Sequence, residues 1–247
     1  MINSNKLYTT GIVVSHSQYS NESAIIMIAT DDGILSFIAP NIYKAKSQLK
    51  PLLLTFAIVE VEYKLLGEDK KVISYVKTIF DPSTLYSDYT YSLFLMLADE
   101  ITNSQFKFGD KYPIDEVKKI LNALNSNKDP LSLMLLFVGT VMRSMGLKIK
   151  TDGCINCDNK SKIVTYSLQD GGFICSNCID EFNLSPKSSN TLYCLKYSFM
   201  DINEKTINTK VPQFDGTVVL VDLLNYLANY FDYKAFKSLP LFIDALK

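Results

Sequence analysis

Two pairs of cysteines constrain the fold of this chain more than any other feature of its sequence. Cys154 and Cys157 form one Cys-x-x-Cys pair, and Cys175 and Cys178 form a second pair after seventeen intervening residues. Each pair bends the backbone so that two sulfurs point to one centre, and two pairs at this spacing are typical of a zinc site. Four deprotonated thiolates are ligands that tetrahedral Zn²⁺ prefers. The sequence therefore predicts one bound Zn²⁺ ion.

The segment between the cysteine pairs has the pattern of a β-hairpin. Residues 160–168 and 173–174 form two short extended runs, and residues 169–172 end in two glycines that suit the turn between them. The second cysteine pair then follows the returning strand, as in zinc ribbons, within a zinc module at about residues 151–182. Because all four ligands are cysteines, the coordination sphere is closed, and we expect a structural role for the zinc.

Composition and charge exclude several broad classes of protein. The chain has 247 residues, of which 47% are hydrophobic and 21% are charged, as is usual for a globular protein of one or two domains. Its net charge of −1 means that nucleic-acid binding would depend on local basic patches. Residues 1–6 lack the apolar run of a signal peptide, and the apolar run 131–142 is too short to span a bilayer. We therefore expect a cytoplasmic protein without a membrane partner.

The N-terminal third of the chain reads as β-strands. The expected strands cover residues 7–14, 24–29, 34–39, 53–63 and 72–76, and Asp32 and Gly33 supply a hairpin turn. Five strands without helical periodicity favour a small closed barrel, since closure removes exposed sheet edges. We predict an OB-type barrel over residues 1–80, which makes the chain an α+β multidomain protein.

The remainder, residues 81–247, is predicted to be a helical domain that carries the zinc ribbon. Apolar residues at helical spacing indicate helices over 85–101, from Pro113, and over 131–145, the last begun by Asp129 and Pro130. Further helical segments are expected over residues 185–199 and 217–233, and Asp215 is predicted to cap the second of these.

A basic loop follows the third predicted strand. No acidic residue occurs between Asp32 and Glu60, while Lys44, Lys46 and Lys50 fall within seven positions. Tyr43 adds an aromatic face beside them. Lysines for phosphates and an aromatic for bases are what a single-strand groove on a small barrel uses. The alternative interpretation is an ordinary solvated loop.

Arg143 is the only arginine of the chain, and it lies in a second interval without acidic residues, 130–151. Lys148 and Lys150 accompany it beside the zinc module. These three cations either flank a DNA-binding groove or favour the C-terminus of the preceding helix electrostatically. The sequence leaves both alternatives open.

Taken together, these segments resemble the RecO family of bacterial recombination mediators of the RecFOR pathway. The segments that carry the resemblance are residues 11–14, 19–23, 32–37, 39–49, 51–52 and Phe56, the two cysteine pairs, residues 184–186 and residues 236–239. The order of barrel, helices and zinc ribbon makes the resemblance specific. Where similar proteins usually carry a run of the type Lys-Gly-Ala-Arg-Arg, this chain has two lysines within residues 40–46. Single lysine charges thus replace the two-pronged phosphate contacts of arginine.

The resemblance implies a DNA repair and recombination protein that is not an enzyme. Its family binds single- and double-stranded DNA, anneals complementary strands, and associates with RecR. It also contacts the C-terminal tail of single-strand-binding protein, through a pocket in the helical domain, and helps to load RecA. On this basis we expect a location at the bacterial nucleoid, with DNA contacts at Tyr43, Lys44, Lys46, Lys50 and Arg143.

Two other functions remain open from the sequence. A zinc-stabilised adaptor would bind proteins through its barrel and have little affinity for DNA, which the near-neutral net charge favours. A thiol oxidoreductase would instead use the Cys-x-x-Cys pairs for redox chemistry, although such pairs usually occur in a βαβ context and not in a hairpin. The single histidine, His16, and the fifth cysteine, Cys194, are expected to be a surface residue and a core residue respectively.

Overall fold

The computed structural model describes residues 6–67 and 69–247 of the chain. Residues 1–5, which include most of the segment used to predict the absence of a signal peptide, lie outside the described part, as does Glu68. The backbone contacts divide the chain into two compact units, Met1–Lys118 and Lys119–Lys247.

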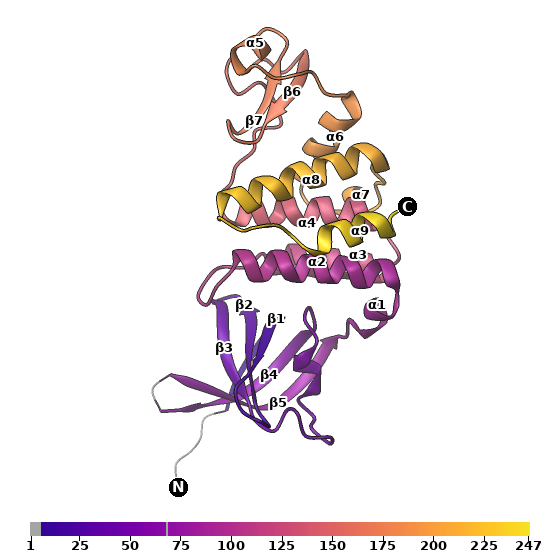
Figure 1. Ribbon diagram of the computed structural model, residues 1–247. Coiled ribbons are helices and arrows are strands. Elements are labelled where there is room, and N and C mark those ends of the chain that lie inside the picture. Colours follow the sequence, from indigo (N-terminus) through magenta and orange to yellow (C-terminus); the bar gives the residue numbers. More distant parts are fainter. Residues whose placement is uncertain (1–5, 68) are drawn as a thin grey trace. The chain divides into compact units, whose positions relative to one another are not determined.

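The first unit contains a closed five-stranded barrel (Figure 1). Its strands are β1 (Leu7–Gln18), β2 (Ala24–Thr30), β3 (Gly33–Ala39), β4 (Ile58–Leu66) and β5 (Lys70–Phe80). The strand order is β1-β2-β3-β5-β4, and β4 pairs back onto β1. All pairs are antiparallel except β3 with β5, which meet in parallel at Ile38 and Val72. The predicted OB-type barrel is therefore confirmed.

The barrel closes around an apolar core made by alternating positions of its strands. Along β2, Ala24, Ile26 and Ile28 are fully buried, while the residues between them are partly exposed. Gly11 of β1 allows a close approach to β2, because a Cβ there would lie 2.2 Å from the carbonyl oxygen of Ala29. Because Gly11 has no side chain, β1 can pair closely with β2 while it also pairs with β4.

The prediction of one strand over residues 53–63 is wrong in its first part. Residues Lys50–Leu53 form a 3₁₀ turn, η1, and β4 begins only at Ile58. Pro51 lacks an amide hydrogen for a strand ladder, and Phe56 has a φ of 68°, which no strand accommodates. Leu52 and Phe56 are nonetheless buried, so this apolar run fills the core from a turn.

Two helices follow the barrel within the first unit, where one helix over 85–101 is predicted. α1 (Ser83–Ser87) ends before Asp88, and α2 (Tyr89–Gln105) begins after it. Asp88 has extended backbone angles, and its carboxylate accepts a hydrogen bond from the amide of Tyr91 at 2.9 Å. Because an N-cap residue cannot continue the preceding helix, Asp88 divides the predicted helix in two. α2 contacts β1.

Helices and one hairpin build the second unit (Figure 1). After α3 (Ile114–Asn125), which begins in the first unit, come α4 (Pro130–Ser144), β6 (Ile163–Ser167), β7 (Gly172–Cys175), α5 (Ile179–Phe182), α6 (Ser189–Ser198), α7 (Glu204–Ile207), α8 (Gln213–Tyr230) and α9 (Ser238–Ala245). α4, α6 and α8 pack against one another, and β6 contacts α6. Asp129 caps α4 as expected, accepting from the amide of Ser132 at 2.9 Å. Gly139 permits the close packing of α4 on α6, since a Cβ there would lie 1.7 Å from the carbonyl oxygen of Ser198.

The predicted cap of α8 is wrong. α8 starts at Gln213, after Pro212, so Asp215 lies inside its first turn. The carboxylate of Asp215 instead accepts hydrogen bonds from the hydroxyls of Ser188 (2.5 Å) and Thr191 (2.7 Å), and these bonds lower its pKa. Asp215 thus joins the start of α8 to the start of α6.

Within residues 6–67 and 69–247, none of the helices has the length and apolar character that crossing a bilayer requires.

Candidate metal centre and nucleic-acid interface

The four paired cysteines converge on one point of the second unit. Their sulfurs all lie within 4.8 Å of one another, and Cys154, Cys175 and Cys178 are buried while Cys157 is exposed. In each pair a backbone hydrogen bond closes the turn: the amide of Asp158 donates to the carbonyl of Cys154, and the amide of Cys178 donates to that of Cys175. The predicted hairpin of β6 and β7 lies between the pairs, with Ile163 opposite Cys175.

This arrangement fits a tetrahedral metal ion. Four sulfurs at about 2.3 Å from a central Zn²⁺ would be roughly 3.8 Å apart, and the sulfurs of Cys157 and Cys175 lie 3.6 Å apart. Ile174 is fully buried among the cysteines, and Ile155, Ile163 and Phe182 pack around them. The four cysteines can therefore hold a metal ion, and their donor set leaves no position for substrate.

Lys150 contacts both the first cysteine pair and the hairpin. Its ammonium lies 2.5 Å from a carboxylate oxygen of Asp158 and donates to the carbonyl of Cys154 at 3.3 Å. Its backbone pairs with Gly172 at the start of β7, where a Cβ would lie 2.3 Å from the carbonyl oxygen of Lys150. The second glycine of the turn is thus required by close packing, and Lys150 is used structurally within the module.

The local environment also favours the thiolate of one ligand. Burial by itself raises the pKa of Cys154, but backbone amides of Cys157 and Cys175 donate hydrogen bonds to its sulfur and lower its pKa to about 6. A deprotonated sulfur is the form that binds metal ions. At Cys178, by contrast, burial and hydrogen bonds with the neighbouring thiols raise the pKa to about 12.

The basic loop of the first unit, residues 40–50, is held against the barrel by apolar anchors. Ile42 and Leu49 lie within the loop, and Leu52 lies just after it. All three belong to the barrel core and are at most 8% exposed. Between them the backbone turns through hydrogen bonds from Lys44 to Asn41 and from Ser47 to Lys44. The intervening lysine side chains are left exposed on a fixed backbone.

The structure brings an acidic residue to this loop that its local sequence lacks. Glu22 lies 3.0 Å from the ammonium of Lys44, in an ion pair whose side chains are about half exposed. The amide of Tyr43 also donates to the carbonyl of Glu22 at 3.3 Å. Both contacts extend the pairing of β2 with β3, in which Ala24 faces Ala39. The predicted strand pairing was the signal that could have located Glu22.

The other predicted contacts in the loop are exposed and available. Lys46 and Lys50 are exposed, and in the described part of the chain no carboxylate lies within 4.0 Å of either ammonium. Tyr43 is 39% exposed. The loop therefore presents two unpaired cations, one paired cation and one aromatic ring, all from a single segment.

Arg143 belongs to the second unit and has structural contacts there. It is half-buried in the last turn of α4, and its guanidinium donates to the carbonyl of Met200 (3.3 Å) and to the hydroxyl of Thr140 (3.1 Å). These bonds hold the segment after α6 against α4. A DNA contact by Arg143 stays a prediction, and it would have to use the part of the guanidinium that these bonds leave exposed.

Cys194 and His16 lie where the sequence predicts. Cys194 is fully buried, and burial raises the pKa of its thiol to about 12. His16 is exposed on β1.

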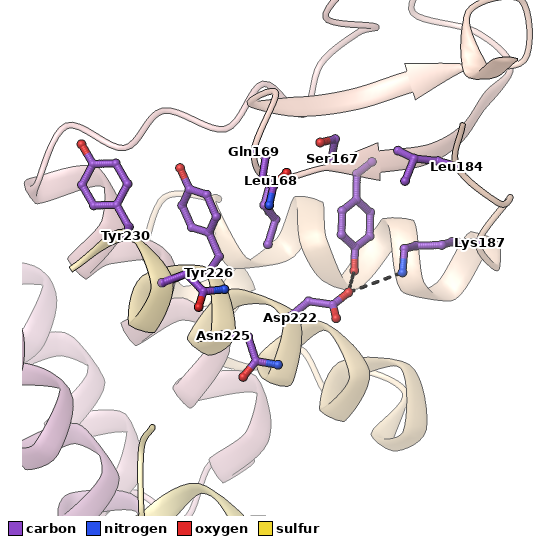
Figure 2. A pocket seen from close by; sticks show the side chains of 11 residues that line it. Ser167, Leu168, Gln169, Leu184, Lys187, Asp222, Asn225, Tyr226 and Tyr230 are labelled. Atoms are coloured by element: carbon purple, nitrogen blue, oxygen red, sulfur yellow. Dashed lines mark hydrogen bonds and ion pairs between the residues drawn. The ribbon is translucent and has the colours of Figure 1, made fainter. Parts of the chain in front are cut away.

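A polar cluster that the sequence interpretation missed joins β6 to α8 (Figure 2). The hydroxyl of Tyr166 donates to the carboxylate of Asp222 at 2.5 Å, and the ammonium of Lys187 lies 3.4 Å from the same oxygen. The spacing of Asp222, Tyr226 and Tyr230 along one helix face was the available signal.

Two models of one protein family match this chain, one in its N-terminal part and one in its C-terminal part. The model described as Recombination protein O N terminal matches residues 4–80, and that described as Recombination protein O C terminal matches residues 112–240, more than half of the chain. A protein from Mesoplasma florum named DNA repair protein RecO is 28% identical over 184 residues, which cover 69% of this chain and 66% of that protein. The matched region thus spans slightly less than two thirds of that relative.

Two further relatives carry the same name. The Bacillus pumilus protein is 25% identical over 76% of this chain and 75% of its own length, and the Lactobacillus delbrueckii protein is 24% identical over 72% and 74%. Among solved structures, an asparaginyl-tRNA synthetase from Pyrococcus horikoshii aligns with 67% of this chain and 38% of its own at 11% identity and a TM-score of 0.28, which supports no conclusion. The two family models, the closed barrel and the clustered cysteines agree, and the chain belongs to the RecO family.

Proposed function

We propose that this protein is a DNA-binding recombination mediator in DNA repair. It binds single- and double-stranded DNA, anneals complementary strands, and with RecR helps to load RecA onto DNA coated by single-strand-binding protein. Family membership supports the repair role, since relatives are named DNA repair proteins. Residues 1–80 would form the DNA-binding domain, and residues 81–247 the helical domain that carries the metal module and meets the tail of single-strand-binding protein.

The anchored basic loop is the observation that supports DNA binding. Its lysines make charge contacts that any phosphate satisfies, and Tyr43 offers a ring on which any base can stack. Neither kind of contact reads sequence. Binding of this kind suits a protein that must hold any strand and release it to a complementary one.

In this proposal the metal is zinc, with one ion per chain held by Cys154, Cys157, Cys175 and Cys178. Bound there, it supplies a cross-link between the two cysteine pairs and no chemistry on a substrate. The apolar side chains around the sulfurs are few, so the module depends on this cross-link for its fold.

The proposal is tested by annealing of two complementary oligonucleotides, with and without single-strand-binding protein. The intact chain should accelerate annealing in both conditions. A Lys46→Ala/Lys50→Ala variant should anneal more slowly, whereas a Lys107→Ala/Lys111→Ala control loses the same charge from exposed positions of the same unit and should not. Equal rates with and without the intact chain would refute the annealing function.

A second candidate is a zinc-stabilised adaptor with little affinity of its own for DNA. The Lys44–Glu22 ion pair and the net charge of −1 favour it, because both reduce the positive field of the barrel. Filter binding of a labelled single strand at low salt distinguishes the two. Retention of the strand supports the mediator, and failure to retain it at low salt supports the adaptor.

A further inference from the structure

The helix α8 has two faces of different chemistry. Its buried face is apolar and consists of Gly216, Val219, Leu220, Leu223, Leu224, Leu227 and Ala228. Its other face carries polar and aromatic residues at the helical spacing i, i+3, i+4, i+7 and i+8: Asp222, Asn225, Tyr226, Asn229 and Tyr230. Asp222 of this second face is bound by Tyr166 of β6, whereas Asn225, Asn229 and Tyr230 are exposed.

This second face forms one wall of a pocket within the second unit (Figure 2). The opposite wall comes from the end of β6 and the turn after it, where Leu168 and Gln169 lie, and Leu184 and Lys187 complete the rim. The pocket is a depression that is largely open to solvent, and its volume is about 680 Å³. We call it the α8 pocket.

One end of the α8 pocket is fixed and electrically balanced. The Asp222 carboxylate accepts from Tyr166 (2.5 Å) and pairs with the ammonium of Lys187 (3.4 Å). That ammonium also lies 4.7 Å from the centre of the Tyr166 ring. Burial and the neighbouring Asp222 raise the pKa of Tyr166, so its hydroxyl keeps its proton and remains a donor. The pocket thus offers neither an unpaired cation nor an unpaired anion at this end.

The other end is open and lined by aromatic rings and amides. The rings of Tyr226 and Tyr230 lie 6.1 Å apart at an interplanar angle of 35°, and Tyr230 is 59% exposed. In the described part of the chain, no hydrogen bond involves the side-chain amides of Gln169, Asn225 or Asn229, so both their donors and acceptors are free for a ligand.

Aromatic faces with free amides match one class of ligand well. A nucleobase is a flat, uncharged ring with donors and acceptors on its edge; the ring stacks on tyrosine, and the edge pairs with amides. We propose that the α8 pocket receives one unstacked base of a single nucleic-acid strand. This site is independent of the lysine loop on the barrel and lies in the other unit.

A peptide ligand is less well matched by these residues. An acidic peptide needs a free cation, and Lys187 is already paired with Asp222. A peptide with large apolar anchors needs a deep apolar floor, whereas the apolar side chains here are Leu168, Leu184 and the tyrosine rings at the rim. The observations therefore favour the base.

The test compares two labelled strands of equal length on the full chain by fluorescence anisotropy. One strand is oligothymidylate, and the other has the same phosphates with abasic sugars. A Tyr230→Ala variant should bind the base-containing strand about 5- to 150-fold more weakly, the usual range for losing one stacking aromatic. Its binding of the abasic strand should be unchanged. Tyr230→Phe, which keeps the ring, should bind as the unchanged chain does.

Tyr193→Ala is the matched control, because Tyr193 is an exposed tyrosine of the same unit outside the pocket. It should bind both strands normally, and thermal melting should show that each variant is folded. Unchanged binding of oligothymidylate by Tyr230→Ala overturns the proposal, as does an equal loss for both strands. Loss of binding to an acidic peptide alone would assign the pocket to a peptide. Binding of free thymidine monophosphate as tightly as the strand would assign it to a free nucleotide.

Discussion

The lysine loop makes a quantitative prediction about the salt dependence of DNA binding. Each phosphate contact on a single strand contributes about −0.7 to the slope of log affinity against log salt concentration. Lys46 and Lys50 are unpaired in the described part of the chain, so Lys46→Ala/Lys50→Ala should flatten the slope by about 1.4. Between 50 and 200 mM salt, a fourfold change, the intact chain should then lose roughly sevenfold more affinity than the variant does.

Glu22 provides a change in the opposite direction. The ammonium of Lys44 lies 3.0 Å from Glu22, so a phosphate must replace that carboxylate before Lys44 can contribute fully. Glu22→Gln removes the competitor, and we expect it to raise affinity at low salt and steepen the slope by about 0.7. The structure therefore predicts opposite effects from the loss of Lys46 and Lys50 and from a change at Glu22, which lies beside the loop.

Fluorescence anisotropy of a labelled oligothymidylate, measured at several salt concentrations, gives these slopes directly. The Lys107→Ala/Lys111→Ala variant controls for net charge, since it removes two exposed lysines outside the loop and should leave the slope unchanged. Slopes that are equal in the intact chain, the loop variant and Glu22→Gln would mean that DNA does not contact this loop.

Three further predictions concern stability. Gly139→Ala should lower the free energy of unfolding by roughly 3 kcal/mol or more in urea titrations, because its Cβ would lie 1.7 Å from the carbonyl oxygen of Ser198; a smaller loss would mean that α4 and α6 separate easily. Cys157→Ser should lower the zinc content, measured by atomic absorption, below one ion per chain, and it should also lower the melting temperature. The reason is that zinc binding in small structural modules contributes an apparent free energy of about 10–16 kcal/mol to folding. An unchanged melting temperature would exclude a structural role. Burial raises the pKa of Asp99, so the folded state binds more protons than the unfolded state and stability falls as pH rises through the range just above the ordinary carboxyl value. Asp99→Asn should remove this fall in urea titrations at acid and neutral pH, and an identical fall in both proteins would contradict it.

The sequence was most informative where a local pattern and the tertiary fold require the same residues. The cysteine pairs and the two glycines before Phe173 predict a hairpin between two metal-binding turns, and the structure has this hairpin. The barrel strands are likewise predictable, because alternating burial along β2 is visible in its sequence. In these segments local preference and core packing act together.

Prediction failed where residues distant in sequence decide the outcome. Asp215 is a residue type that often caps helices, but it does not cap α8. Its carboxylate accepts hydrogen bonds from Ser188 and Thr191 and so connects α8 to α6. Lys44 looked free because no acid is near it in sequence, whereas strand pairing brings Glu22 to it. The apolar run after Pro51 suggested a strand, and it fills the core from a turn instead. Only the tertiary arrangement contains this information.

The buried anchors of the basic loop have a consequence for how its charged positions can be changed. Ile42 and Leu49 hold the loop to the barrel core, while the charged positions between them contribute nothing to that core. Substitutions of Lys46 or Lys50 should therefore leave the packing of the barrel core unchanged. The charge of the loop can thus be altered by substitution while the barrel beneath it stays the same. A loop of this design separates the side chains that meet solvent from the side chains that hold the loop in place.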